Sequence, residues 1–288
     1  MITLLAVLAL LIVSPASGYA QDSLFITRNR AAISWEEAMP IGNGKFGAKV
    51  FGGAETDSIL FIDQTLTKEL NDCYAPFAKL TITDKNKEAS TYIKQSLNLN
   101  RSLLTDEYKQ NGHIFSRESF ASYPDKVIGI RIKCNNENSV EKVAHINYTF
   151  ELSSAYQESS EAKDNHITLT GQTNGANGRT KFYTRLILNS TDGKIRTRNN
   201  TIEVKDASEI TLYVINETGT ADGSEIKDEI ELQTERLKMK DYDKIRFFHI
   251  SDYRNISARF MPQRKLTKEQ FLDSTYSNYL FISWPSRK

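Results

Sequence analysis

The sequence has almost no net charge, because its 37 basic and 36 acidic residues leave a formal charge of +1. A chain without an excess of Lys and Arg offers little electrostatic attraction to nucleic acid or to an anionic membrane surface, so neither is expected as a partner. Hydrophobic residues make up 39% of the chain and charged residues 25%. These fractions are typical of a globular protein with a full hydrophobic core.

Cysteine and histidine are also scarce. The two cysteines, Cys73 and Cys134, and the four histidines are scattered singly, without the close spacing that metal sites show. No metal site is therefore expected. In an oxidising compartment the cysteines could form a disulfide, which would contribute roughly 3–4 kcal/mol through loop closure. Two buried thiols are the alternative.

Long apolar runs are missing except at the N-terminus. Residues 2–13 are almost wholly apolar, no charged side chain precedes Asp22, and small residues lead up to Ala20. This pattern predicts a secretory signal peptide over residues 1–20, with an N-terminal membrane anchor as the alternative. The run is shorter than the ~20 residues of a spanning helix. We therefore expect an exported protein, periplasmic or secreted, without a membrane span after signal cleavage.

Glycine is infrequent, but five of the 14 glycines fall within residues 42–53. Asn43-Gly44 is a strong turn signal, and residues 46–51 look like a strand, so a hairpin is expected. Gly42, Gly44 and Gly47 match the spacing of the dinucleotide-binding fingerprint. That fingerprint requires a helix directly after it, where strand-like residues stand instead. We therefore expect no nucleotide cofactor.

The chain from residue 23 to 215 shows mainly the two-residue period of β-strands. Short turn signals such as Asp192-Gly193 and Asn199-Asn200 separate the strand-like segments. Many strands with short turns predict a mainly β protein, a large antiparallel β-sandwich over residues 21–222. The polar residues 153–164 are expected to form a long loop.

The pattern changes after Gly223. Apolar residues there recur at helical spacing among charges, and Thr267-Lys268-Glu269-Gln270 resembles a capping box. Residues 223–288 are therefore expected to form two or three helices, as a short helical C-terminal segment.

Four blocks of sequence resemble glycoside hydrolase family 95, the α-L-fucosidase family. Residues 35–53 are similar to the opening of its N-terminal β-domain, with Trp-x-x-Ala-x-Pro-Ile-Gly-Asn-Gly-x-x-Gly-Ala-x-Val-Phe-Gly-Gly. Residues 59–66 resemble a following strand. Residues 116–128 resemble the family's Arg-Glu-x-Phe-Ala-Ser-Tyr-Pro-Asp-x-Val. Residues 249–253, His-Ile-Ser-Asp-Tyr, resemble its helical linker.

The resemblance implies a two-sheet "supersandwich" and an inverting hydrolase that acts on fucosylated glycans. In the family, the catalytic Glu and Asp lie in an (α/α)6 barrel after the linker. Residues 279–288 resemble the start of that barrel, so we expect a domain truncated before it, with no catalytic residue of its own. Another chain could supply the barrel. The alternatives are a free-standing carbohydrate-binding or surface interaction module, and a gene fragment without activity.

The candidate binding residues are Trp35 and Asn43. Trp offers a flat apolar face to a sugar, and Asn offers a donor and an acceptor together. A core Trp and a turn Asn are the competing interpretation. No carboxylate pair of the kind a glycosidase needs is evident, since Glu36 and Glu37 are adjacent and point to opposite faces in a strand. Asp63 and Gln64 replace the family's Asn-Glu pair, which leaves the sugar contact on that side unsupported.

Overall fold

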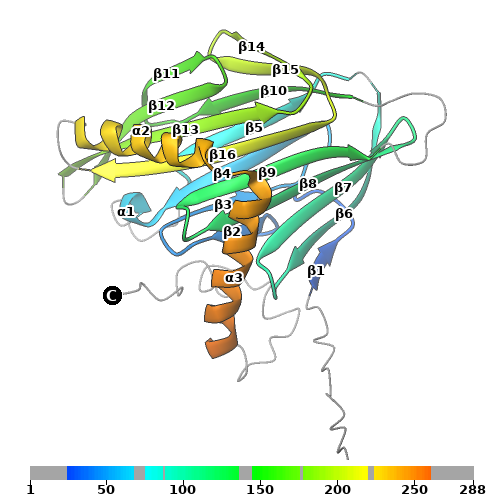
Figure 1. Ribbon diagram of the computed structural model, residues 1–288, viewed down its shortest axis with the longest axis horizontal. Coiled ribbons are helices and arrows are strands. Elements are labelled where there is room, and N and C mark those ends of the chain that lie inside the picture. The colour runs from blue at the N-terminus through cyan, green and yellow to red at the C-terminus, as the bar shows by residue number, and fades with distance from the viewer. Residues whose placement is uncertain are drawn as a thin grey trace, which may run out of the picture.

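The computed structural model describes residues 25–67, 75–86, 88–135, 145–175, 178–219 and 224–260 of the 288-residue chain (Figure 1). Within these residues, the strands form two antiparallel sheets, and helices α2 (Ser224–Lys238) and α3 (Tyr242–Phe260) follow the last strand. The predicted fold class, a large antiparallel sandwich followed by a helical segment, is confirmed. The predicted signal peptide, Cys73 and the barrel-like residues 279–288 lie outside the described residues.

The nine-stranded sheet carries both long helices on its outer face (Figure 1). Its strand order is β1-β6-β7-β8-β9-β16-β13-β12-β11. The bounds are β1 (Phe25–Arg28), β6 (Ser90–Asn98), β7 (Leu103–Gln110), β8 (His113–Ser122), β9 (Val127–Asn135), β16 (Glu209–Gly219), β13 (Gly178–Ser190), β12 (His166–Gly175) and β11 (Gln157–Lys163).

The seven-stranded sheet packs against the inner face of the first sheet. Its order is β14-β15-β10-β5-β4-β3-β2, and the short helix α1 (Gln64–Thr67) follows β4. The bounds are β2 (Met39–Gly42), β3 (Phe46–Val50), β4 (Thr56–Asp63), β5 (Ala78–Asp84), β10 (Ile146–Ser153), β14 (Lys194–Arg198) and β15 (Thr201–Ala207).

The main core fills the space between the sheets with side chains that alternate along each strand. On β9, Ile128, Ile130 and Ile132 are fully buried and belong to this core, whereas Val127 packs on the opposite face. Successive side chains of a strand point to opposite faces, so the two-residue period of the sequence sends one row into the core.

Residues 157–163 correct the sequence-based expectation of a loop, since they form β11 at the edge of the nine-stranded sheet. This strand pairs only with β12 among the described strands, and most of its side chains are exposed. Among its residues only the partly buried Ala162 is apolar and packs against the core, so the alternation that marks a half-buried strand is missing.

A second, smaller core lies on the outer face of the nine-stranded sheet, beneath α2 and α3. Ile230 and Leu237 of α2 and Ile245 of α3 pack there against Phe120 and Tyr213 of the sheet. None of the helices in the described part of the chain is long and apolar enough to cross a membrane.

A cluster of buried charges connects the two sheets inside the sandwich. Arg117 Nη2 of β8 lies 2.9 Å from Asp57 Oδ2 of β4, and Arg117 Nε lies 3.6 Å from Asp106 Oδ2 of β7. The Asp57 carboxylate also accepts hydrogen bonds from three backbone N–H groups of the β3–β4 turn. Burial raises the pKa of Asp106 to about 6, although the charge of Arg117 opposes the rise. These paired charges are buried, and they connect the two sheets of the sandwich.

Candidate functional site

Asn43 organises the predicted hairpin between β2 and β3. Its Oδ1 accepts hydrogen bonds from the backbone N–H of Lys45 (3.1 Å) and Phe46 (2.9 Å), and its Nδ2 donates to the carbonyl of Ser122 (3.0 Å). Gly44 follows with a φ of 92°, which favours glycine. The Asn43 amide is thus already engaged in the turn and in a contact to β8, and its contact with a sugar stays a prediction.

Trp35 is half-buried in the loop before β2. Lys49 Nζ lies 5.5 Å from the centroid of its ring and donates a hydrogen bond to the Ala38 carbonyl (3.1 Å). Burial lowers the pKa of Lys49 to about 8, against the opposing effect of the Glu36 charge. The ammonium therefore occupies one face of the indole, and stacking of a sugar on Trp35 stays a prediction.

The turn between β8 and β9 joins this hairpin to the helices. The Asp125 carboxylate accepts a hydrogen bond from Ser122 Oγ (3.0 Å) and forms an ion pair with Lys240, which follows α2. Gln233 of α2 donates its side-chain amide to the Asp125 carbonyl. The backbone carbonyl of Ser122 also accepts a hydrogen bond from the Asn43 side-chain amide. A continuous series of polar contacts therefore runs from the hairpin to α2.

Helix α3 is attached to the same part of the sandwich by the predicted linker motif. His249 Nε2 lies 3.1 Å from each of two backbone carbonyls in the β6–β7 turn, and its ring stacks on Phe120 at 4.7 Å. The Tyr253 hydroxyl donates to the carbonyl of Leu99 (2.8 Å). Three of the four sequence blocks that carry the family resemblance, at residues 35–53, 116–128 and 249–253, therefore meet where the helices pack on the sheet.

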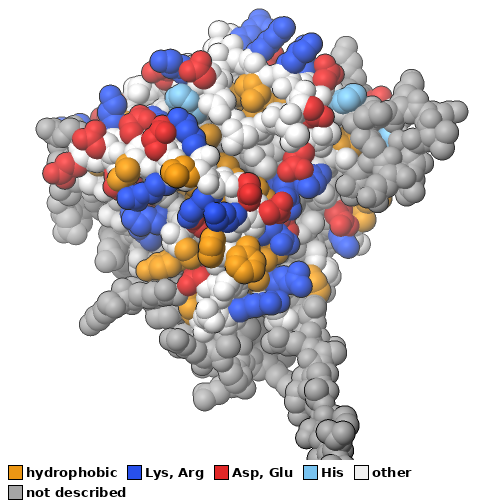
Figure 2. Space-filling model, viewed as in Figure 1, with side chains coloured by type: hydrophobic (Ala, Val, Ile, Leu, Met, Phe, Trp, Pro, Cys, Tyr) orange, Lys and Arg blue, Asp and Glu red, His pale blue; other side chains and the backbone are white. Residues whose placement is uncertain are grey.

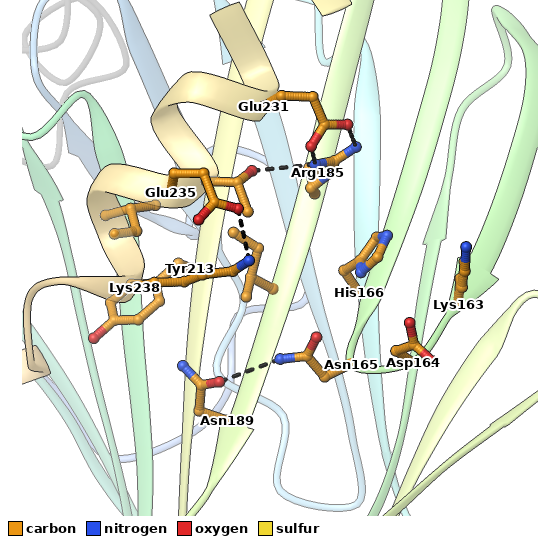
Figure 3. Close-up of a pocket in the computed structure, with 13 residues that line it drawn as sticks. Lys163, Asp164, Asn165, His166, Arg185, Asn189, Tyr213, Glu231, Glu235 and Lys238 are labelled. Carbon is orange, nitrogen blue, oxygen red and sulfur yellow. Dashed lines mark hydrogen bonds and ion pairs between the residues drawn. The ribbon is translucent and has the colours of Figure 1, made fainter. Parts of the chain in front are cut away.

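A pocket of about 370 Å³ lies beside this junction, between α2 and the outer face of the nine-stranded sheet. Figure 3 shows residues of α2 on one side and residues of the β11–β12 turn on the other, with Arg185 between them. The floor includes a row in register across three strands, formed by His166 of β12, Ile187 of β13 and Tyr213 of β16. Antiparallel pairing brings these three positions side by side on one face.

Arg185 is fixed by four contacts at the edge of the floor. Its guanidinium forms two parallel hydrogen bonds with the Glu231 carboxylate of α2, at 2.7 and 2.8 Å. It also donates to Oγ1 of Thr168 (3.1 Å) and of Thr234 (3.2 Å). The hydrogen bond from Arg185 is the main reason that the pKa of Glu231 is lowered. Burial, followed by the charge of Arg185, lowers the pKa of His166, so its imidazole is neutral at pH 7.

The carboxylates of this pocket are not arranged as a glycosidase acid and base. A general acid needs a raised pKa, whereas Glu231 is held ionised by Arg185. Glu235 forms an ion pair with Lys238 (2.7 Å) one turn along the same helix. Glu231 and Glu235 are therefore paired groups of the lining and do not form the acid and base of a glycosidase.

The remaining candidate groups are metal-binding side chains and the thiol of Cys134. No group of three or more His, Cys, Asp or Glu side chains there could hold a metal ion. Cys134 is buried, and burial raises its pKa to about 11. Cys73, with which it could form a disulfide, lies outside the described residues.

The comparison with protein families identifies residues 62–222, more than half of the chain, as a match to glycosyl hydrolase family 65, N-terminal domain. The chain belongs to this family. The match covers β5 to β16 and the end of β4, and therefore most of both sheets. The coarse part of the prediction, an N-terminal β-sandwich domain of a glycoside hydrolase, is confirmed. No curated protein matches the chain.

The chain is also similar to solved structures of carbohydrate-active proteins. A candidate kojibiose phosphorylase from human microbiome matches with a TM-score of 0.53 and 12% identity, over 81% of this chain and 38% of its own. A bacterial glucoamylase complexed with acarbose matches with a TM-score of 0.44 and 12% identity, over 89% of this chain and 41% of its own. The chain thus spans less than half the length of either protein, and at this identity the first likeness shows the fold alone.

The sequence did not predict the pocket. His166 was expected to be a surface or core residue, and Arg185 and Glu231 carried no signal of their own. The pairing of Thr168 with Arg185 on neighbouring strands, and the spacing of Glu231 and Thr234 on α2, become informative only when α2 is placed over β13. That placement depends on tertiary packing and not on a local pattern.

Proposed function

We propose that this chain is the non-catalytic N-terminal domain of a carbohydrate-processing enzyme of the α-L-fucosidase type, as in glycoside hydrolase family 95. In this role it is a scaffold that holds the linker helices α2 and α3 against a catalytic barrel carried elsewhere. The observation that supports this most is the convergence of the hairpin, the β8–β9 turn and the linker motif on one junction. These are the same blocks that resemble family 95.

The arrangement of charges supports a non-catalytic role. Hydrolysis of a glycosidic bond by this class needs two carboxyl groups on opposite sides of the bond, one of them protonated. Asp106 has a raised pKa but lies fully buried beside Arg117. Glu231, in the pocket, is ionised and bound to Arg185. Neither position combines a proton with access to substrate.

The surface of the linker helices supports docking of a further domain. Leu232, Met239, Phe247 and Phe248 are large apolar side chains that are 46%, 85%, 65% and 41% exposed. Figure 2 shows hydrophobic side chains interspersed with Lys and Arg on this face of the molecule. Exposed apolar clusters of this kind are typical of interaction surfaces.

The proposal includes export to the periplasm or the exterior, based on residues 1–20. Cell fractionation with N-terminal sequencing of the mature protein tests it, and the expected first residue is Gln21. A mature protein that retains Met1 in the cytoplasm would contradict export.

The test of the main proposal is an activity assay of the purified full chain with an aryl α-L-fucoside and a 2-fucosylated oligosaccharide. No turnover above the level of a mock purification is expected. Turnover that co-purifies with the chain and is lost on substitution of one of its own carboxylates would contradict the proposal.

The pocket favours a second role as a carbohydrate-binding module, which is compatible with the scaffold role. Calorimetric titration with fucosylated oligosaccharides tests binding directly. If the sugar binds at the hairpin instead of in the pocket, Trp35→Ala should abolish the binding of the oligosaccharide.

A further inference from the structure

The pocket beneath α2 is neutral as a whole, although it is rich in charged groups. Its cations are Lys163, Arg185 and Lys238, and its anions are Asp164, Glu231 and Glu235. Two of the cations are already paired with anions inside the pocket. Since His166 is also neutral, the lining has no surplus of either sign to attract a charged ligand.

The lining nevertheless offers hydrogen-bonding groups that no described residue uses. Asn165 Nδ2 donates to Asn189 Oδ1 (3.3 Å) and to the Leu188 carbonyl (2.9 Å). Among the described residues, nothing donates to Asn165 Oδ1 and nothing accepts from Asn189 Nδ2. Figure 3 shows the two amides side by side at the bottom of the opening. An acceptor and a donor held together in this way suit a pair of neighbouring hydroxyl groups.

The remaining surface is amphipathic. Its apolar part is narrow, because Ile187, Tyr213 and Leu237 are only 6%, 3% and 5% exposed and belong to the small core beneath α2. Burial raises the pKa of Tyr213 to about 12, so its hydroxyl stays protonated. The imidazole of His166 makes no hydrogen bond within the described residues and presents one donor and one acceptor. The cavity volume of about 370 Å³ lies near the lower end of the roughly 300–1,000 Å³ of small-molecule sites.

We propose that this pocket binds a neutral saccharide unit, with its hydroxyl groups on Asn165, Asn189 and His166 above the narrow apolar floor. The choice of a sugar among neutral, hydroxyl-rich ligands rests on the proposed carbohydrate-processing function. The geometry of the pocket does not depend on that function. The site would hold a part of the glycan away from the bond that is cleaved.

The test is a titration of the full chain with methyl α-L-fucoside, methyl β-D-galactoside and methyl α-D-glucoside, followed by calorimetry and saturation-transfer NMR. We expect at least one to bind in the millimolar range. Asn189→Ala and Asn165→Ala should each weaken binding roughly 3- to 10-fold, the effect of one lost hydrogen bond. Gln157→Ala is the matched control, because it removes an exposed amide at the far end of β11.

Several outcomes would overturn the proposal. One is the absence of binding of all three glycosides. Another is binding that both Asn variants leave unchanged while Trp35→Ala removes it, which would place the sugar at the hairpin. Circular dichroism and thermal melting of each variant show whether it is folded, and Asn189 is exposed, so its substitution should leave the fold intact.

A second variant tests the charge argument. Glu231→Gln removes the negative partner of Arg185 and leaves the pocket with one surplus positive charge. Inorganic phosphate should bind this variant more tightly than the unmodified chain, and the glycoside should not gain affinity. Tight binding of phosphate by the unmodified chain would contradict the neutral site.

Failure of this inference is distinguishable from failure of the proposed function. If the chain binds no glycoside and shows no turnover, the pocket proposal and the carbohydrate-binding role fail, and the scaffold proposal stands. If it hydrolyses a fucoside, the scaffold proposal fails, whatever the pocket binds.

Discussion

Arg117 and Arg185 are both buried arginines of the nine-stranded sheet, but they serve opposite faces of it. Arg117 points into the sandwich, where its side chain is 2% exposed and its partner Asp57 is 0% exposed. Arg185 points outward to the pocket, where its side chain is 8% exposed and its partner Glu231 is 50% exposed. The first pair is therefore sealed from water, whereas the second borders it.

This difference shows how the same residue type can stabilise the interior in one place and line a ligand-binding pocket in another. Removing one partner of an ion pair that is sealed from water leaves a charge without water or a counter-ion. The free energy of unfolding falls as a result. Removing Arg185 leaves the carboxylate of Glu231, which is 50% exposed and which water can solvate. The pocket pair can thus be altered without unfolding the protein, as a recognition site requires.

The largest expected effect comes from Arg117→Met, which leaves Asp57 and Asp106 buried without a cation. We expect the free energy of unfolding to fall by about 3–5 kcal/mol, measured by urea denaturation monitored by circular dichroism. Arg185→Met, the matched variant on the outer face, should cost about 1 kcal/mol, because it mainly loses hydrogen bonds. Equal losses in the two variants would remove the distinction between the two arginines.

Gly52→Ala should have the next largest effect on the interior cluster. Gly52 has a φ of +82°, and a Cβ there would come within 2.5 Å of Asp106 Oδ1 and 2.8 Å of Gln95 Nε2. We expect a loss of about 2–4 kcal/mol from backbone strain and overpacking together. Gly112→Ala is the control, since its φ is +84° but nothing lies within 4 Å of its Cβ. The free energy of unfolding of this variant should fall by only about 1 kcal/mol. An equal fall in the two variants would contradict the close packing around Gly52.

The interior cluster should also make stability depend on pH. The folded protein raises the pKa of Asp106 from its ordinary value of 3.8 to about 6. Between these values the folded state holds a proton that the unfolded state has lost, so stability falls as the pH rises from about 4 to about 6. Urea midpoints measured across this range check the slope. Asp106→Asn should flatten it, and an unchanged slope in the variant would assign the effect to other groups.

The smallest effect is expected on the exposed face of α3. Phe247 is 65% exposed, so Phe247→Ser should change the free energy of unfolding by less than about 0.5 kcal/mol. Ile245, two residues earlier, is fully buried beneath the helix, and Ile245→Ala should cost about 2–4 kcal/mol. Thermal melting of both variants makes the comparison, and a strongly destabilised Phe247→Ser would mean that this face is covered within the chain.

The sandwich could be predicted from the sequence because each buried strand carries its own evidence. Residues 127–133 and 146–152 show the apolar period that the core requires, and Asn43-Gly44 specifies its turn locally. The strand at residues 157–163 was missed because an exposed edge strand has no buried face to reveal it.

The pocket and the buried ion cluster could not be predicted for a different reason. Asp106 and Arg117 are cross-strand partners on β7 and β8, and the packing of the two sheets brings Asp57 of β4 to them. Arg185 and Glu231 meet only because α2 folds back over β13. The partners of these ion pairs lie 11, 46 and 60 positions apart in the sequence, so no local pattern connects them.

The central claim is the proposal that this domain is a scaffold of a sugar-processing enzyme and does not itself cleave a glycosidic bond. The most direct measurement is the rate at which the pure full chain releases fucose from an aryl α-L-fucoside, compared with a mock purification. The account predicts equal rates in the two samples. A rate that scales with the concentration of the chain and disappears when one of its own carboxylates is replaced by an amide would contradict it.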